Sequence, residues 1–135
     1  MTTRTLLETG QRLPMMTVES VDGGAPVLLR RSGRTATVLV TVHRECDACR
    51  AYLDALAHEQ AGIDEWDGRV VATFANEATA DAGIPAPAVL IADQWGELFV
   101  IEPVGDDHAF IEPAEVVSWL RYLAVQCPEC QGEAL

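Results

Sequence analysis

Four cysteines, arranged as two Cys-x-x-Cys pairs, are the residues of this chain best suited to chemistry. The first pair is Cys46 and Cys49, and the second is Cys127 and Cys130. Two residues between cysteines at the start of a helix bring both thiols within bonding reach. One thiolate can then attack a disulfide while the other thiol resolves the mixed disulfide. The same spacing is also that of half a zinc site, so the pattern alone leaves both kinds of site open.

Within the first pair we expect Cys46 to attack and Cys49 to resolve. The free amides and the dipole of a helix N-terminus stabilise a thiolate at the first position. Arg44 and Arg50 could add to this stabilisation. Glu45, just before the pair, and Asp47, within it, oppose it. The sequence therefore leaves the redox potential and the direction of electron flow open.

The elements that must position the first pair are those of an α/β fold. Residues 35–42 form a β-branched run typical of a strand buried on both faces, and apolar residues recur at helical spacing from Asp47 onward. The order is therefore strand, cysteine pair, helix. The other expected elements are an N-terminal hairpin over 15–29, a strand over 69–74, a turn or short helix over 77–82, a hairpin over 89–101 and a last helix over 113–126.

Composition and charge narrow the class of protein. The chain has 135 residues, 49% hydrophobic and 22% charged, which is enough for one domain with its own core. Nine basic residues against 21 acidic ones give a formal charge of −12, which opposes binding to nucleic acid or to anionic membranes. We find neither a signal peptide nor the ~18 apolar residues of a membrane span, so we expect a cytoplasmic location. In the cytoplasm, cysteine pairs are more often catalytic or metal-binding than structural.

Four segments occur in an order that resembles a known superfamily. They are a Gly-x-x-x-Pro segment at 10–14, the apolar strand at 38–42 with its cysteine pair, a Pro-strand-Asp-x-x-Gly hairpin at 87–96 and the last helix. The chain resembles the thioredoxin-like superfamily. The similarity is to its redoxin branch, which joins alkyl hydroperoxide reductase and thiol-specific antioxidant proteins with thiol-disulfide oxidoreductases.

The resemblance implies a fold and a division of the chain. We expect a thioredoxin-like redoxin domain over residues 1–126, with a central mixed β-sheet flanked by helices and an N-terminal β-hairpin. A short tail, residues 127–135, would carry the second cysteine pair. The resemblance also implies that Pro87 is a cis-proline facing Cys46 and Cys49, and that Ala86 offers its backbone to a bound substrate.

The activity that the resemblance implies is thiol-disulfide exchange without an organic cofactor. The partners would be a protein or small-molecule disulfide or thiol and a recycling reductant, and a homodimer stays open.

Two departures from the superfamily pattern bear on this activity. Glu45 stands where thioredoxins have Trp, and Val40 stands where they have a buried carboxylate, which argues against a general thioredoxin role.

A peroxiredoxin-like peroxidase with an antioxidant role is the first alternative. Peroxiredoxins use Pro-x-x-x-Thr/Ser-x-x-Cys, in which the hydroxyl helps to activate the peroxide. Aligned on Cys49, the hydroxyl position holds Cys46 and the proline position Val42; aligned on Cys46, these positions hold His43 and Leu39. Neither alignment keeps the pattern, so peroxide reduction ranks below disulfide exchange. We expect His43 to be an exposed strand-end residue and assign it no role.

A non-catalytic module that binds zinc through its cysteines is the second alternative. A last helix of ~14 residues would carry Cys127 and Cys130 about 20 Å from the first pair. This distance disfavours a single zinc site made of all four cysteines. A local disulfide or dithiol, a metal site shared between two chains, and electron exchange with a neighbouring chain's Cys46 all stay open for the second pair.

Overall fold

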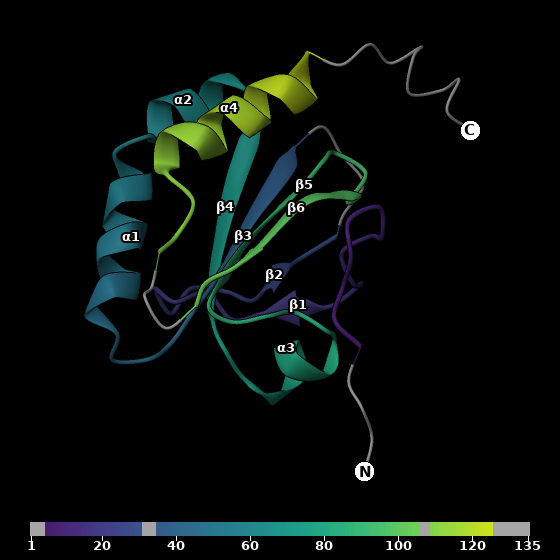
Figure 1. The fold of residues 1–135 in the computed structure, drawn as a ribbon, viewed down its shortest axis with the longest axis vertical. Helices are drawn as coiled ribbons and strands as arrows, with labels where there is room; N and C mark the ends of the chain where they lie inside the picture. Colours follow the sequence, from purple (N-terminus) through teal and green to yellow (C-terminus); the bar gives the residue numbers. More distant parts are fainter. Residues whose placement is uncertain (1–4, 31–34, 106–108, 126–135) are drawn as a thin grey trace.

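The computed structural model describes residues 5–30, 35–105 and 109–125, which form a central sheet with helices and a small hairpin packed against it (Figure 1). Two short strands come first, β1 (Thr17–Val18) and β2 (Val27–Leu28). The remaining elements are β3 (Ala36–Val42), α1 (Asp47–Ala57), α2 (Gln60–Glu65), β4 (Gly68–Phe74), α3 (Glu77–Asp81), β5 (Ala88–Ala92), β6 (Leu98–Pro103) and α4 (Pro113–Ala124).

The sheet has four strands in the order β4-β3-β5-β6. Strand β3 runs parallel to β4 and antiparallel to β5, and β5 runs antiparallel to β6. At the middle of β3, Leu39 pairs with Val71 of β4 on one side and with Leu90 of β5 on the other. All seven residues of β3 are buried, as expected for an interior strand covered on both faces. The loop that follows β3 therefore begins at a buried strand that is paired on both sides.

Side chains of β3 alternate between two hydrophobic layers because successive residues of a strand point to opposite faces. Val38, Val40 and Val42 lie in the layer beneath α1, α2 and α4. Leu39 lies in the other layer, with residues of the N-terminal segment and the hairpin. Figure 1 shows the same division, with α1, α2 and α4 on one side of the sheet and β1, β2 and α3 on the other.

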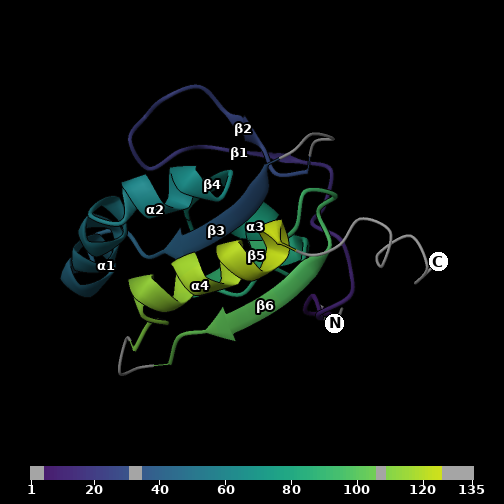
Figure 2. The ribbon, with the colours of Figure 1, turned by 90° about the horizontal axis from the view of Figure 1, so that it is seen from above.

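Helix α4 begins beside α1 and runs along the sheet away from it (Figures 1 and 2). Its N-cap is Glu112, and Pro113 occupies the first helical turn, where a missing backbone N–H leaves no hydrogen bond unmade. The buried residues Val116, Leu120 and Leu123 form the stripe that packs on the sheet. This direction agrees with the expected course of the last helix.

The hairpin is joined to the edge of the sheet by side-chain and backbone hydrogen bonds. The Arg69 guanidinium of β4 donates to the carbonyls of Leu28 and Leu29, at 2.8 and 3.0 Å. The backbone N–H of Val21 donates to the carbonyl of Ala72 at 2.9 Å. The connection between β1 and β2 (residues 19–26) therefore lies along the end of β4, close to where the parallel strand β3 also ends.

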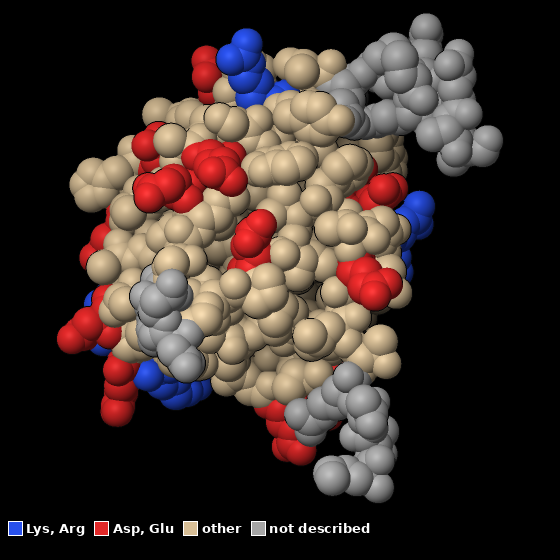
Figure 3. All heavy atoms as spheres, in the orientation of Figure 1, with Lys and Arg blue, Asp and Glu red and all other residues tan. Residues whose placement is uncertain are grey.

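Acidic side chains are scattered over the visible face and are not gathered into one patch (Figure 3). This distribution fits a formal charge of −12 spread along the chain. None of the helices within the described ranges has the length and apolar character needed to cross a membrane.

Most expected elements are present, with shifts of a few residues at their ends. The first helix begins at Asp47, inside the cysteine pair, and β6 continues to Pro103, two residues beyond the expected strand. Helix α2 was not expected, because its six residues contain a single fully buried side chain, Ile63, and show no clear period. The boundary predicted between 126 and 127 lies outside the described residues, as do Cys127 and Cys130.

Candidate functional site

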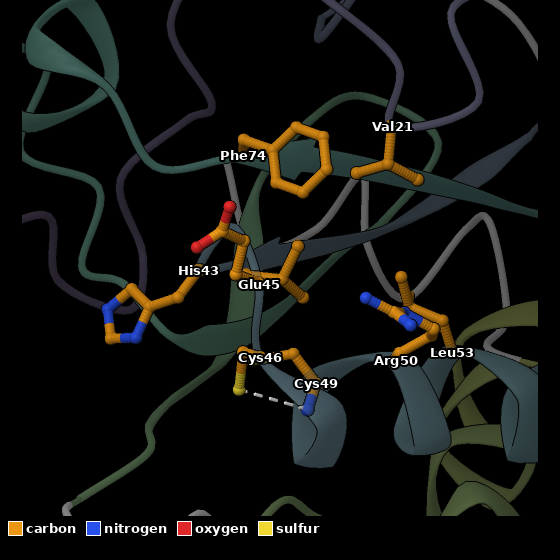
Figure 4. Close-up of a pocket in the computed structure, with 9 residues that line it drawn as sticks. Val21, His43, Glu45, Cys46, Cys49, Arg50, Leu53 and Phe74 are labelled. Atoms are coloured by element: carbon orange, nitrogen blue, oxygen red, sulfur yellow. Dashed lines mark hydrogen bonds between the residues drawn. The ribbon is translucent and has the colours of Figure 1, made fainter.

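Cys46 lies between β3 and α1 and is the N-cap of α1. Its backbone is extended, with φ −118° and ψ 109°, and its Sγ accepts a hydrogen bond from the backbone N–H of Cys49 at 3.2 Å (Figure 4). A sulfur in this position occupies the place of a capping oxygen, where free amides and the helix dipole stabilise negative charge. Cys46 is half-buried, so a substrate can reach it.

Cys49 lies in the first turn of α1 and is only 1% exposed. Burial is the main cause that raises the pKa of its thiol, and the hydrogen bond with Cys46 and the charge of that residue act in the same direction. The two thiols therefore have different surroundings. Cys46 is reachable and lies at a helix N-terminus, whereas Cys49 is sheltered behind it and held in the protonated form.

The chain turns sharply at Glu45, where φ is 54°. A residue with a Cβ rarely adopts this left-handed conformation, which costs roughly 1 kcal/mol. The turn leads the chain from the end of β3 into the extended N-cap residue Cys46. Figure 4 shows Glu45 and His43 on one side of the site and Arg50 on the other.

A pocket of about 190 Å³ opens beside the two cysteines. Phe74, the last residue of β4, and Val21, from the connection between β1 and β2, lie across the pocket from Cys46 and Cys49 (Figure 4). Leu53, one turn further along α1, adds a third apolar side chain. Cys46 therefore borders a surface that is apolar on one side and charged at its rim.

Sequence reasoning did not place Val21 or Phe74 in the site. A signal for Phe74 was present, because it ends a strand parallel to β3, and parallel strands end at the same edge of a sheet. Val21 gave no such signal. Its position depends on the hydrogen bond to Ala72, which joins residues far apart in the sequence.

Arg44 and Arg50 flank the cysteine pair in the sequence, and their side chains line different pockets. The Arg44 guanidinium stacks over the ring of Phe74, with its central carbon 4.4 Å from the ring centroid. Arg50 lines the pocket beside Cys49. Neither guanidinium forms an ion pair with a residue of the described ranges, so both are available to an anionic group.

Ala86 and Pro87 come directly before β5, and the peptide bond between them is cis. The register pairs Ala88 with Thr41, the next-to-last residue of β3. The Thr41 hydroxyl donates to the carbonyl of Pro85 at 2.7 Å, which fastens this loop to β3. The loop and the cysteine pair therefore leave the same end of β3. A role for Ala86 and Pro87 in holding substrate stays a prediction.

A metal centre finds no support in the part of the chain that the structure describes. There, no group of three or more histidine, cysteine or acidic side chains is arranged to hold a metal ion. Cys46 and Cys49 lie together without further ligands, and the second cysteine pair falls outside the described ranges.

Solved structures of known proteins share this architecture. A peroxiredoxin-like protein from Aquifex aeolicus has a TM-score of 0.66 at 16% identity, covering 87% of this chain and 88% of that one. A thiol:disulfide interchange protein from Chlorobium tepidum has a TM-score of 0.63 at 12% identity, covering 87% and 98%. The fold is thioredoxin-like. The thioredoxin domain of a thiol-disulfide oxidoreductase from Bacteroides vulgatus adds a third example, with a TM-score of 0.58 at 13% identity over 84% of this chain and 99% of that one.

These similarities confirm the thioredoxin-like fold that the sequence predicted. At this level of identity they establish the fold alone. The sequence matches no protein-family model and no curated protein. The chemistry of this thioredoxin-like protein must therefore be argued from its own residues.

Proposed function

We propose that the protein is a thiol-disulfide oxidoreductase in which Cys46 is the attacking thiol and Cys49 the resolving thiol. The observation that carries the proposal is the 3.2 Å hydrogen bond from the Cys49 N–H to the Sγ of Cys46. It joins a half-buried sulfur at a helix N-terminus to a second cysteine that is sheltered behind it. A dithiol that exchanges with disulfides needs these two properties in its two members.

The first step forms a mixed disulfide. The Cys46 thiolate attacks one sulfur of a substrate disulfide, a bond forms between the two sulfurs, and the substrate S–S bond breaks. The second substrate sulfur leaves as a thiolate with the electron pair and takes a proton from solvent. The N–H of Cys49 is directed at the Cys46 sulfur while that sulfur is charged.

The second step releases the product. Cys49 loses its proton to solvent and attacks the Sγ of Cys46, so that the protein disulfide forms, the bond between Cys46 and the first substrate sulfur breaks, and that sulfur leaves as a thiolate with the electron pair. Two electrons have then passed from the protein to the substrate, and a thiol reductant restores the dithiol. Because burial raises the pKa of Cys49, we expect this step to be slow near neutral pH and to accelerate as pH rises.

Replacement of each cysteine separates the two roles. Cys46→Ser should abolish the two-electron couple of the first pair, because Cys49 is then left without a partner thiol and is itself only 1% exposed. Cys49→Ser should form a mixed disulfide with glutathione that persists, because no thiol resolves it. In the wild type, the same mixed disulfide should decay faster at higher pH. Mass spectrometry of alkylated protein across a glutathione redox series measures all three results.

Cys127→Ser is the matched control, because it removes a cysteine outside the proposed site. We expect Cys46 and Cys49 to have the same redox potential in this variant as in the wild type. A couple that vanishes with Cys127→Ser and persists with Cys46→Ser would contradict the proposal. Rapid peroxide consumption by the reduced protein would favour a peroxidase. Uptake of zinc by cysteines that do not cycle would favour the metal-binding alternative.

A further inference from the structure

A second pocket, of about 220 Å³, adjoins the one beside Cys46. The two pockets share Val21 and Phe74 as lining residues, so they lie next to each other at these side chains. Each is smaller than the roughly 300–1,000 Å³ typical of ligand sites, and the two together fall within that range. The combined space therefore suits a ligand that extends from the reactive sulfur into the second pocket.

The second pocket contains a cation with no anionic partner among the described residues. Arg44 lines it, and its guanidinium is held over the face of Phe74. In a chain with a formal charge of −12, acidic partners are plentiful, yet Arg44 pairs with none of those described. The stacking fixes the planar group while leaving its N–H donors free for a ligand.

A second lining group also offers a donor. The Asn76 side-chain oxygen accepts from the N–H of Thr79 at 2.9 Å, which leaves its amide NH₂ as a donor. Thr73 lines the same pocket, but its hydroxyl is buried in the protein and out of reach of a ligand. The one acidic side chain of the lining is that of Glu19, which is exposed. The pocket therefore presents the Arg44 guanidinium and the Asn76 amide as donors to an acidic group.

We propose that the second pocket binds a carboxylate of the substrate, so that the preferred substrate is the disulfide of a small acidic thiol. The inference rests on the proposed function, because it adds a substrate class to the same site. Arg44 precedes Cys46 by two residues, which limits the separation of their Cα atoms to about 7 Å. A carboxylate bound at Arg44 can therefore belong to the same molecule as the sulfur that Cys46 attacks. Planar carboxylates match the fork of a guanidinium.

Two chromogenic disulfides test the proposal. Dithiobis(nitrobenzoic acid) carries carboxylates, and dithiodipyridine has none. The reduced wild type and Arg44→Gln are each mixed with both reagents, and the ratio of the two rate constants is compared. The ratio is the rate constant with the carboxylate reagent divided by that with the neutral reagent. We expect it to be about three- to fivefold lower in Arg44→Gln than in the wild type, as for the loss of a solvent-exposed ion pair. Added salt should lower the wild-type ratio and leave that of the variant almost unchanged.

Arg121→Gln is the matched control, because it changes the net charge equally on α4, away from both pockets. Its ratio should equal that of the wild type. An equal loss of rate toward both reagents in Arg44→Gln would overturn the carboxylate proposal, since Arg44 would then act on Cys46 itself. If the ratio fell equally in Arg44→Gln and Arg121→Gln, the effect would come from net charge, and this result would also overturn the proposal. A protein that forms no disulfide with either reagent would instead contradict the proposed function.

Discussion

Tyr52 lies on α1 three residues after Cys49 and stacks on Phe110, with ring centroids 4.3 Å apart. Its hydroxyl is buried and has no hydrogen-bond partner among the described residues. Burial is the main cause that raises its pKa, and the charges of Glu112 and Glu115 add to the effect. The ring stabilises the contact between α1 and the segment before α4, whereas the hydroxyl opposes folding.

Replacing Tyr52 by Phe should therefore stabilise the protein. The ring contact is kept and an unpaired buried hydroxyl is removed, so the free energy of unfolding should rise by about 1–2 kcal/mol. The raised pKa of Tyr52 means that the folded state keeps its proton after the unfolded state has lost it. Wild-type stability should therefore fall as pH rises above about 10, and this fall should be smaller in Tyr52→Phe.

Urea denaturation of both proteins, at neutral pH and above the usual tyrosine pKa, measures the two effects. Cys49 also has a raised pKa, but it is present in both proteins and cancels in their difference. A Tyr52→Phe variant less stable than the wild type at neutral pH would mean that the hydroxyl does form a hydrogen bond.

Residue types and spacing pointed to the cysteine pair on which the proposed function rests. Cys46 and Cys49 follow from the Cys-x-x-Cys pattern between a buried strand and a helix, and the cis bond at Pro87 follows from the resemblance. The left-handed turn at Glu45 could not be foreseen, because this conformation is unusual for a residue with a Cβ. Val21 could not be foreseen either, since only the folded sheet brings it to the pocket.

At the scale of elements, Gly83 joins the N-terminal segment to the end of α3 through a backbone hydrogen bond. Its φ is +82°, and its carbonyl accepts a hydrogen bond from the N–H of Leu7 at 2.9 Å. A Cβ added at this position would collide with the carbonyl oxygen of Thr5. Glycine is therefore required here both for its conformation and for the close approach of another backbone.

Gly83→Ala should lower the free energy of unfolding by roughly 2 kcal/mol or more, since it adds a backbone collision to the strain of a left-handed alanine. Gly23→Ala is the matched control. Its φ is +81°, and a Cβ there would meet nothing within 4 Å, so it should lose only about 1 kcal/mol. Urea midpoints of the two variants measure the difference. Equal losses would show that the N-terminal segment moves aside without cost.

Periodicity predicted the elements that carry many buried residues, and it missed α2, whose six residues contain one fully buried side chain. The seven buried residues of β3 and the buried stripe of α4 are strong signals. The hairpin pairs only two residues of each strand, so its ends could not be predicted from alternation. Its place on the sheet depends on Arg69, a single polar residue whose partners cannot be inferred from the sequence.

At the scale of the whole molecule, the formal charge of −12 acts against compactness. Acidic side chains are scattered over the visible face (Figure 3), so their mutual repulsion is spread through the structure and is not focused on one pair. Salt weakens repulsion between exposed charges, with a screening length of about 10 Å at 0.1 M. The folded state should gain more from this screening than the expanded unfolded chain.

Sodium chloride should therefore raise the melting temperature between low salt and physiological ionic strength, by a few degrees for a chain of this size. Thermal unfolding followed by circular dichroism measures the shift. Glu65→Gln replaces an exposed acidic residue at the end of α2. It should slightly raise the melting temperature at low salt and reduce the further rise that sodium chloride causes. A melting temperature that falls with sodium chloride would indicate that attractive ion pairs outweigh the repulsion.

The connection between β1 and β2 supplies Val21 to both pockets, whereas the cysteines belong to the segment between β3 and α1. In the proposed function, the reactive thiols and part of the surface beside them therefore come from different segments of the chain. If the proposed function holds, mutations or insertions in residues 19–26 should alter which disulfide fits without changing either thiol. The same separation then offers a route to engineering, because a library restricted to this connection would vary substrate choice while the proposed cysteine pair stays constant.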